Sequence, residues 1–182
     1  MPWDSLEIAK LAVQAATPVV AIAIAYRINR AIEQFKHTQW RNQKLIEKRI
    51  AAYDTVASEL NDIICYYAYV GRWKDLSPLD ILSKKRNIDK NIYLCAPFFS
   101  ENILTPYNTL MGLCFEMFAG SGKDAKLRTD FQKRKPFFNG EWDNAWDVRF
   151  SGKTLPSATY FDAYHDLMSI FTKEIGLEPP NR

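Results

Sequence analysis

The most constraining feature of the sequence is an apolar stretch near its N-terminus. Residues 8–26 read IAKLAVQAATPVVAIAIAY, in which the clearly polar members are Lys10, Gln14 and Thr17. A helix needs about 20 mainly apolar residues to cross a bilayer, and Lys10 lies close enough to one end to reach the headgroups. Membrane helices also tolerate an internal proline such as Pro18. The stretch therefore predicts one membrane-spanning helix, kinked at the proline.

Two other interpretations of this stretch stay open. A cleaved signal peptide is favoured by the alternation of Ala21, Ala23 and Ala25, which resembles a cleavage site. Such peptides carry basic residues before their apolar core, however, whereas Asp4 and Glu7 precede this one. A buried core helix of a soluble domain is favoured by the modest hydrophobicity of the many alanines.

Basic residues are concentrated directly after the apolar stretch. Between Arg27 and Arg49 the chain has seven basic residues, against the two acidic residues Glu33 and Glu47. Because lysine- and arginine-rich segments stay in the cytoplasm, we expect the N-terminus outside and the rest of the chain inside, at a bacterial inner membrane. The residues expected at the membrane surface, where anionic headgroups attract them, are Arg27, Arg30, Lys36, Arg41 and Lys44.

One face of the apolar stretch is polar. Four polar residues recur at spacings of three and four, which places them on one side of a helix. They are Glu7, Lys10, Gln14 and Thr17. Polar groups in hydrocarbon usually face a bundle interior or a water-filled path, so we expect several copies of the chain to assemble around this face. A pore is one hypothesis, and a simple anchor with interfacial polar residues is the other.

The remainder of the sequence predicts an all-α body. Apolar residues keep helical spacing over residues 46–67, and a second helix begins at Ser77-Pro78, a capping residue followed by proline. Further elements are expected as a helix from Ser100 to Gly120, a short basic helix over 124–135, a turn or helix over 141–150 and a last helix over 157–175. We therefore expect an anchor over 1–27, a basic juxtamembrane helix over 28–44 and a cytosolic bundle of about five helices over 45–182.

Motifs for catalysis are scarce. GSGKDAK at 120–126 and SGKT at 151–154 resemble phosphate-binding loops, but Met117 and Asp147 occupy the place of a glycine that a Walker loop requires. Cys65, Cys95 and Cys114 lie in apolar runs without the spacing of a zinc site, which predicts free core thiols in a reducing compartment. We expect a non-enzymatic protein with no cofactor and no metal.

Arg30 and His37 offer a catalytic alternative. Their spacing loosely fits the R-x4-6-H pattern of the helical ribonucleases called HEPN domains. That resemblance implies a histidine and an arginine that handle a ribose hydroxyl and a phosphate within a dimeric cleft. A membrane-tethered ribonuclease is therefore the rival hypothesis to a protein without catalytic activity.

Cations and aromatic rings cluster in LRTDFQKRK at 127–135 and in the FFNGEWDNAW that follows. Cations beside stacking rings can bind a nucleotide or single-stranded nucleic acid, and the alternative is core packing with a solvated basic edge. The candidate ligand- or RNA-binding residues are Arg128, Lys133, Arg134, Lys135, Trp142 and Trp146.

Three runs carry a resemblance to known proteins: YDTVASELNDIICYYAYVGRWKDLSP at 53–78, NIDKNIYLCAPFFSE at 87–101 and FEMFAGSGKDAKLRTDF at 115–131. They resemble a group of uncharacterised bacterial single-pass membrane proteins with a cytosolic helical domain. By layout, the chain also resembles the membrane accessory protein of type VI-B CRISPR systems, in which a HEPN-like body oligomerises into a membrane pore.

The combined expectation is a membrane-anchored homo-oligomer. The resemblance implies an antiviral-defence effector that permeabilises the inner membrane. Its expected partners are the lipid bilayer and further copies of itself, with a defence-system protein or RNA as additional candidates. A non-catalytic scaffold that recruits a partner to the membrane remains a third hypothesis.

Overall fold

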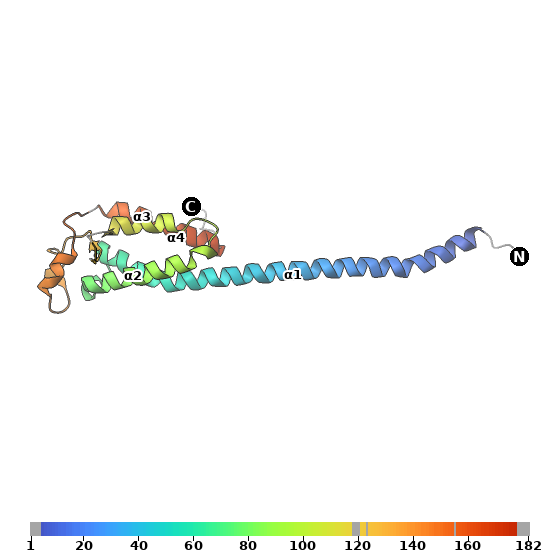
Figure 1. The fold of residues 1–182 in the computed structure, drawn as a ribbon, viewed down its shortest axis with the longest axis horizontal. Helices are drawn as coiled ribbons and strands as arrows, with labels where there is room; N and C mark the ends of the chain where they lie inside the picture. The colour runs from blue at the N-terminus through green and yellow to red at the C-terminus, as the bar shows by residue number, and fades with distance from the viewer. Residues whose placement is uncertain (1–4, 118–120, 123, 155, 178–182) are drawn as a thin grey trace. The chain divides into compact units, whose positions relative to one another are not determined.

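The structure is a computed structural model that describes residues 5–117, 121–122, 124–154 and 156–177 (Figure 1). Its α-helices are α1 (Ser5–Ala68), α2 (Pro78–Cys95), α3 (Leu104–Cys114) and α4 (Ser157–Ile175). The 3-10 helices are η1 (Trp73–Asp75), η2 (Ala96–Phe98), η3 (Lys135–Phe137) and η4 (Asn144–Arg149), and the strands are β1 (Phe115–Glu116) and β2 (Lys126–Leu127). The described part of the chain is thus mostly helical, which confirms the predicted all-α class.

The chain divides into two units, residues 1–45 and residues 46–182. The first unit contains the N-terminal part of α1. The second contains the rest of α1 and all the other described elements. The predicted segments 1–27 and 28–44 therefore belong to one unit, and α1 continues as a helix across both of their boundaries.

Within the first unit, α1 contains Pro18. Proline has no N–H to donate, and its ring clashes with the carbonyl four residues earlier, which bends a helix. Figure 1 shows α1 bent near its N-terminal end, in the part drawn dark blue.

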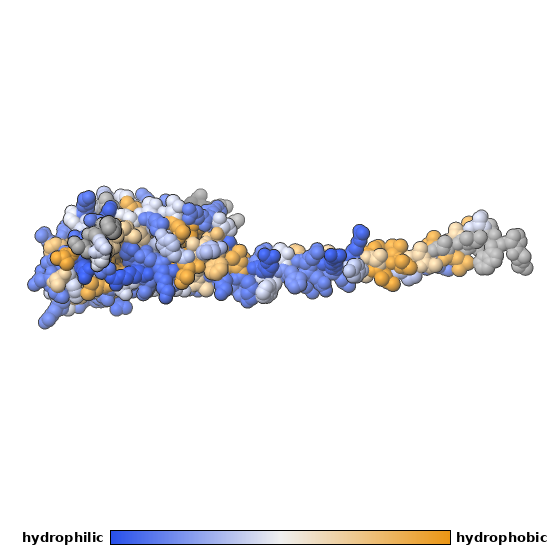
Figure 2. Space-filling view, in the orientation of Figure 1, coloured by the Kyte–Doolittle hydropathy of each residue, from blue (hydrophilic) through white to orange (hydrophobic). Residues whose placement is uncertain are grey.

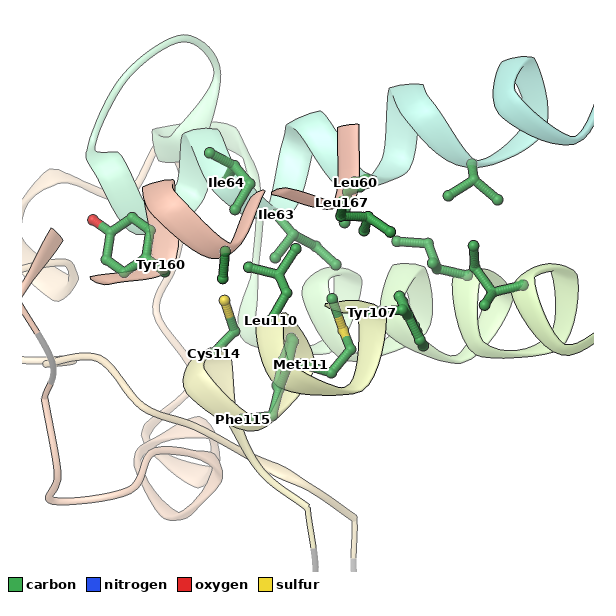
Figure 3. Packing of buried hydrophobic residues seen from close by; sticks show 14 of the residues in the cluster. Leu60, Ile63, Ile64, Tyr107, Leu110, Met111, Cys114, Phe115, Tyr160 and Leu167 are labelled. Atoms are coloured by element: carbon green, nitrogen blue, oxygen red, sulfur yellow. The ribbon is translucent and has the colours of Figure 1, made fainter. Parts of the chain in front are cut away.

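The core of the second unit lies between α1, α2, α3 and α4. Leu60 and Ile63 of α1, Leu110 and Met111 of α3 and Leu167 of α4 are fully buried, and Figure 3 shows them gathered between the helices. The helices form because apolar residues three and four positions apart fall on one face and are covered together. The helix predicted over 46–67 is confirmed as the C-terminal part of α1.

The start of α2 and the end of α4 follow the predicted signals. Ser77 caps α2: its hydroxyl accepts from the N–H of Asp80 (3.1 Å), and the Asp80 carboxylate accepts from the N–H of Ser77 (2.8 Å). Pro78 occupies the first turn, where its missing N–H costs nothing. Gly176, with a φ of +82°, ends α4 in the left-handed conformation that glycine adopts readily.

The predicted extension of α3 is wrong. The helix ends at Cys114, and Phe115 begins a short antiparallel pair in which it faces Leu127. The Cys114 carbonyl accepts from the N–H of Arg128 (2.8 Å) and from the Tyr67 hydroxyl, so tertiary partners replace the next helical bond. The predicted end at Gly120 lies outside the described residues.

The basic helix predicted over 124–135 is also wrong. Lys126 and Leu127 form β2, and the Asp130 carboxylate then accepts from the N–H of Gln132 (2.8 Å). An aspartate that bonds the backbone two residues ahead competes with helix formation. Over the predicted turn or helix at 141–150 the chain forms η4, which Asp143 caps by accepting from the N–H of Ala145 (2.8 Å).

Candidate functional site

The first candidate is the apolar stretch of α1. Among the described residues, one helix is long and apolar enough to cross a membrane, as judged by length and composition. In its most apolar segment of 18 residues, no residue is buried within the structure. Val19, Val20, Ile22 and Ile24 are each more than half exposed. Figure 2 shows this stretch in orange and the following part of the first unit mainly in blue. Within the first unit, no described residue covers these side chains as a soluble core would.

The polar residues of this stretch differ in whether the helix itself satisfies them. Lys10, Gln14 and Thr17 are exposed, whereas the side chain of Glu7 lies outside the described residues. The Thr17 hydroxyl donates to the Val13 carbonyl (2.6 Å), which satisfies it within the helix. The ammonium of Lys10 and the amide of Gln14 are therefore the polar groups on this face that lipid would leave unsatisfied.

The residues predicted for the membrane surface continue along the same helix. All are exposed: Arg27, Arg30, Lys36, Arg41 and Lys44. Tyr26 closes the apolar stretch and Trp40 lies within the basic part, and both are more than half exposed. Tyrosine and tryptophan are enriched where the hydrocarbon of a bilayer meets the headgroups, and Tyr26 lies at the end of the apolar stretch, the position expected for such a residue. Sequence reasoning did not single out these two rings.

Arg30 and His37 lie exposed on α1. Seven residues are about two helical turns, so the two side chains share a face and start about 10 Å apart along the axis. One hydrogen bond does not bridge that distance, and a catalytic site that used both groups would need a substrate long enough to reach both. The ribonuclease alternative stays a prediction.

The predicted ligand-binding cluster separates into two groups in the second unit. Arg134 is 2% exposed, and its guanidinium stacks on the rings of Tyr66 (3.8 Å) and Tyr69 (4.2 Å). It donates to the Tyr66 carbonyl (2.7 Å) and to the Thr129 hydroxyl (2.8 Å). Burial lowers the pKa of Arg134 from its ordinary value. This arginine is occupied in joining the end of α1 to the loop after β2.

Lys135 and the two tryptophans also make contacts within the chain. Lys135 donates to Asn144 (2.5 Å), and Trp142 donates through its ring N–H to Asp147 (2.8 Å). The rings of Trp142 and Trp146 lie edge to face at 5.3 Å. The two tryptophans form a small aromatic cluster with Phe138 at η4, and Lys135 is bonded beside it.

Arg128 and Lys133 instead face a hollow of about 550 Å³. The Nε atom of Arg128 is buried, and no hydrogen-bond partner for it is found among the described residues. A second hollow of about 450 Å³ is lined by Tyr69, Trp73, Lys74, Lys133 and Phe137. Because Tyr69 and Lys133 line both hollows, the two adjoin. The sequence could not reveal this, since Trp73 and Lys133 come together through the fold.

The remaining titratable groups have structural surroundings. The three cysteines are free, as predicted, and burial raises the pKa of the Cys114 thiol to about 12. Lys85 pairs with Asp89 (2.6 Å), which also accepts from the Tyr107 hydroxyl. Among the described residues, no group of three or more histidine, cysteine, aspartate or glutamate side chains is placed to hold a metal ion.

Comparison with protein-family models, with curated proteins and with solved structures finds no match to this chain. The resemblances drawn from the sequence therefore stay predictions, and functional arguments rest on the residues themselves.

Proposed function

We propose that the chain is a single-pass membrane protein that self-associates through the polar face of its N-terminal helix. The observation that carries this proposal is the exposed apolar stretch over residues 8–26, which is left uncovered within its own unit. As a helix this stretch is about 28 Å long, close to the roughly 30 Å hydrocarbon thickness of a bilayer. Lipid would remove from water the apolar side chains that the first unit leaves exposed.

The orientation follows from charge. Basic residues dominate after Tyr26, and the positive-inside rule places them, with the second unit, on the cytoplasmic side of an inner membrane. Each basic residue near an anionic surface contributes about 1 kcal/mol of attraction. Because α1 continues as one helix past Tyr26, Arg27 and Arg30 follow within about 6 Å along the helix axis, whereas Lys36, Arg41 and Lys44 follow at about 15–27 Å. The attraction to anionic headgroups therefore acts mainly on Arg27 and Arg30, since it is screened over about 8 Å.

Self-association is supported by Lys10 and Gln14. Both are exposed on one face of an otherwise apolar helix, and polar groups in hydrocarbon are stabilised when they meet partners from another helix. A ring of copies around this face would place the polar groups inward, where water can reach them. Permeabilisation of the membrane, as by an antiviral effector, is the activity that such an assembly supports.

The test compares the full-length chain with the double variant Lys10→Leu/Gln14→Leu, reconstituted in lipid vesicles that contain a fluorescent dye. We expect the parent to release dye and to run as a multimer in mild detergent, and the variant to lose both properties. The matched control is Lys90→Leu/Gln132→Leu, which makes the same exchanges at two exposed positions of the second unit. A double variant that leaks and assembles like the parent refutes the assembly.

The alternatives give different results in the same preparation. A membrane-tethered ribonuclease would cleave labelled RNA and lose cleavage in His37→Ala. A scaffold would remain a monomer, cause no leakage and leave RNA intact. All three hypotheses share the membrane helix, and self-association is preferred because Lys10 and Gln14 are exposed on its apolar part, whereas Arg30 and His37 start about 10 Å apart.

A further inference from the structure

The second unit carries two adjoining hollows of complementary chemistry. One is lined by the cations Arg128 and Lys133 and by Thr154, and the other by the rings of Tyr69, Trp73 and Phe137. We propose that together they bind a nucleotide, with its phosphate in the first hollow and its base on the rings of the second.

The first hollow has the features of an anion site. Neither Arg128 nor Lys133 has a side-chain hydrogen bond or ion pair with any described residue, so both charges are available to a ligand. Asp130 also lines this hollow, and its carboxylate accepts from the N–H of Gln132 (2.8 Å). The charged side chains of the lining therefore have an excess of one positive charge, which favours a phosphate over a neutral ligand.

The start of α4 adds to this potential. Thr154, Tyr160 and Phe161 line the hollow, so the N-terminus of α4 lies beside it. Among the described residues, no side chain forms a capping hydrogen bond to that terminus, and its first turn contains no acidic residue. Unpaired N–H groups at a helix N-terminus attract phosphate oxygens. The terminus reinforces the two cations without being needed to define the site.

Hydrogen bonds within the chain reduce the repulsion between the end of α1 and an anion in this hollow. A helix C-terminus presents carbonyl oxygens that repel negative charge. The Tyr66 carbonyl accepts from Arg134 (2.7 Å), and the Tyr67 carbonyl accepts from the Tyr160 hydroxyl (3.2 Å). Internal donors therefore satisfy these oxygens, and Arg134 adds positive charge behind the hollow.

The second hollow presents rings at the surface. Phe137 is 55% exposed and Tyr69 is 37% exposed, while Trp73 lies edge to face with both, at 6.3 Å and 5.1 Å. Lys74 lies 5.7 Å from the ring centres of both Trp73 and Phe137. Exposed rings flanked by lysines are the surroundings in which nucleotide bases stack, and stacking accepts any base.

Tyr69 joins the two hollows in an unusual conformation. Its φ of 59° lies in the left-handed region, where the residue that ends a helix is usually glycine. A tyrosine there is strained, and such strain is retained where the surroundings fix the residue. The Tyr69 ring covers Arg134 and forms part of the wall of both hollows, so the strained backbone holds the ring where a base and its phosphate would meet.

The experiment is isothermal titration calorimetry of the full-length chain in non-ionic detergent. The probes are AMP, adenosine, inorganic phosphate and a single-stranded RNA octamer. We expect AMP to bind saturably and adenosine and phosphate to bind at least about tenfold more weakly, because each offers only one half of the required contacts. Absence of saturable AMP binding up to about 1 mM, or equal binding of AMP and adenosine, would overturn the proposal.

Two surface variants test the two halves separately. We expect Lys133→Gln to weaken AMP binding about tenfold and Phe137→Ala to weaken AMP and adenosine by the same factor. The charge-matched control is Lys153→Gln, an exposed lysine that lines neither hollow, and it should stay within about twofold. Loss of affinity in the control equal to that in Lys133→Gln overturns the assignment.

The RNA arm identifies the source of the nucleotide. An octamer that binds more than tenfold tighter than AMP, with the same dependence on Lys133 and Phe137, assigns the site to a nucleotide within a strand. Equal affinities assign it to a free nucleotide. Both results support the site, and an octamer whose binding is insensitive to Phe137→Ala refutes base stacking there.

Discussion

The ion pair between Arg49 and Glu174 joins the two ends of the second unit. Arg49 of α1 donates to the Phe98 carbonyl (2.7 Å), to the Glu174 carbonyl (2.9 Å) and to the Ser100 hydroxyl (2.9 Å). Its guanidinium lies 2.8 Å from the Glu174 carboxylate, and the two side chains are 11% and 6% exposed. The Glu174 carboxylate also accepts from the N–H groups of Ser100 (3.1 Å) and Glu101 (2.9 Å).

We predict that Glu174→Gln destabilises the second unit by about 3 kcal/mol. Glutamine keeps an oxygen for the two backbone N–H groups but removes the charge, which leaves the Arg49 cation nearly buried and unpaired, a change that costs about 3–5 kcal/mol in buried pairs. We take the lower end because Arg49 keeps two backbone carbonyl partners. The double variant Arg49→Met/Glu174→Gln should lose less than the sum of the single variants, by about 1–2 kcal/mol.

Urea unfolding of the full-length chain in detergent, followed by near-ultraviolet circular dichroism, measures this loss. With a urea dependence of about 1.5–2 kcal/mol per molar, the midpoint should fall by roughly 1.5–2 M. The control is Lys173→Gln, which removes an exposed pair with Glu101 and should cost less than about 1 kcal/mol. Equal losses in Glu174→Gln and Lys173→Gln, or strict additivity in the double variant, would show that the pair of Arg49 and Glu174 does not stabilise the second unit as described.

The same pair predicts a pH dependence. Burial raises the pKa of Glu174, but the N–H donors of Glu101 and Ser100 and the charge of Arg49 outweigh it, so the pKa lies below its ordinary value of 4.5. A carboxyl group with a lowered pKa in the folded state stabilises above its unfolded value, and that stabilisation is lost as the pH falls through the folded value. The parent should therefore lose stability below about pH 4.5 more steeply than Glu174→Gln.

Three further predictions use the same unfolding preparation. Ser77→Ala removes the cap of α2 and should cost about 1 kcal/mol, and an unchanged midpoint would argue against the capping interaction. Arg134→Lys cannot stack between Tyr66 and Tyr69 while it also bonds the Tyr66 carbonyl, so it should cost about 2 kcal/mol; a loss below 0.5 kcal/mol contradicts this. The Cys114 thiol, with its pKa raised to about 12 by burial, should react with a thiol reagent at pH 7 far more slowly in the folded chain than in urea, and equal rates would contradict its burial.

Local signals predicted several elements well. Ser77 and Pro78 marked the start of α2 because a capping side chain and a proline act within one turn of the helix. Gly176 marked the end of α4 because glycine readily adopts the left-handed conformation that ends a helix, which is also a local effect. The apolar periodicity of residues 46–67 predicted a helix because apolar residues three and four positions apart lie on one helical face, and that face is buried in the core.

Other elements depended on partners distant in the sequence. Residues after Cys114 continue the apolar period, but Phe115 pairs with Leu127 in a strand, so the tertiary contact overrides the local preference. Arg134 looked like a surface cation within KRK, yet it is buried because Tyr66 and Tyr69 stack on it. The sequence predicted a cluster of cations and aromatic rings over residues 127–146. Only the fold shows that Arg134 is buried, whereas Arg128 and Lys133 line a hollow.

Alkaline carbonate extraction of membranes from cells that express the full-length chain shows whether α1 is embedded in lipid. We expect the parent to stay in the membrane pellet, because residues 8–26 would lie within the bilayer. Ala16→Lys/Val19→Lys places two charges within two residues of the centre of the stretch, at about 3 kcal/mol each, and should move a large share of the chain to the supernatant. Ile28→Lys/Ile32→Lys adds the same charges beyond the stretch and should stay in the pellet. A parent chain that appears in the supernatant as a soluble monomer would show that residues 8–26 do not anchor it in a membrane.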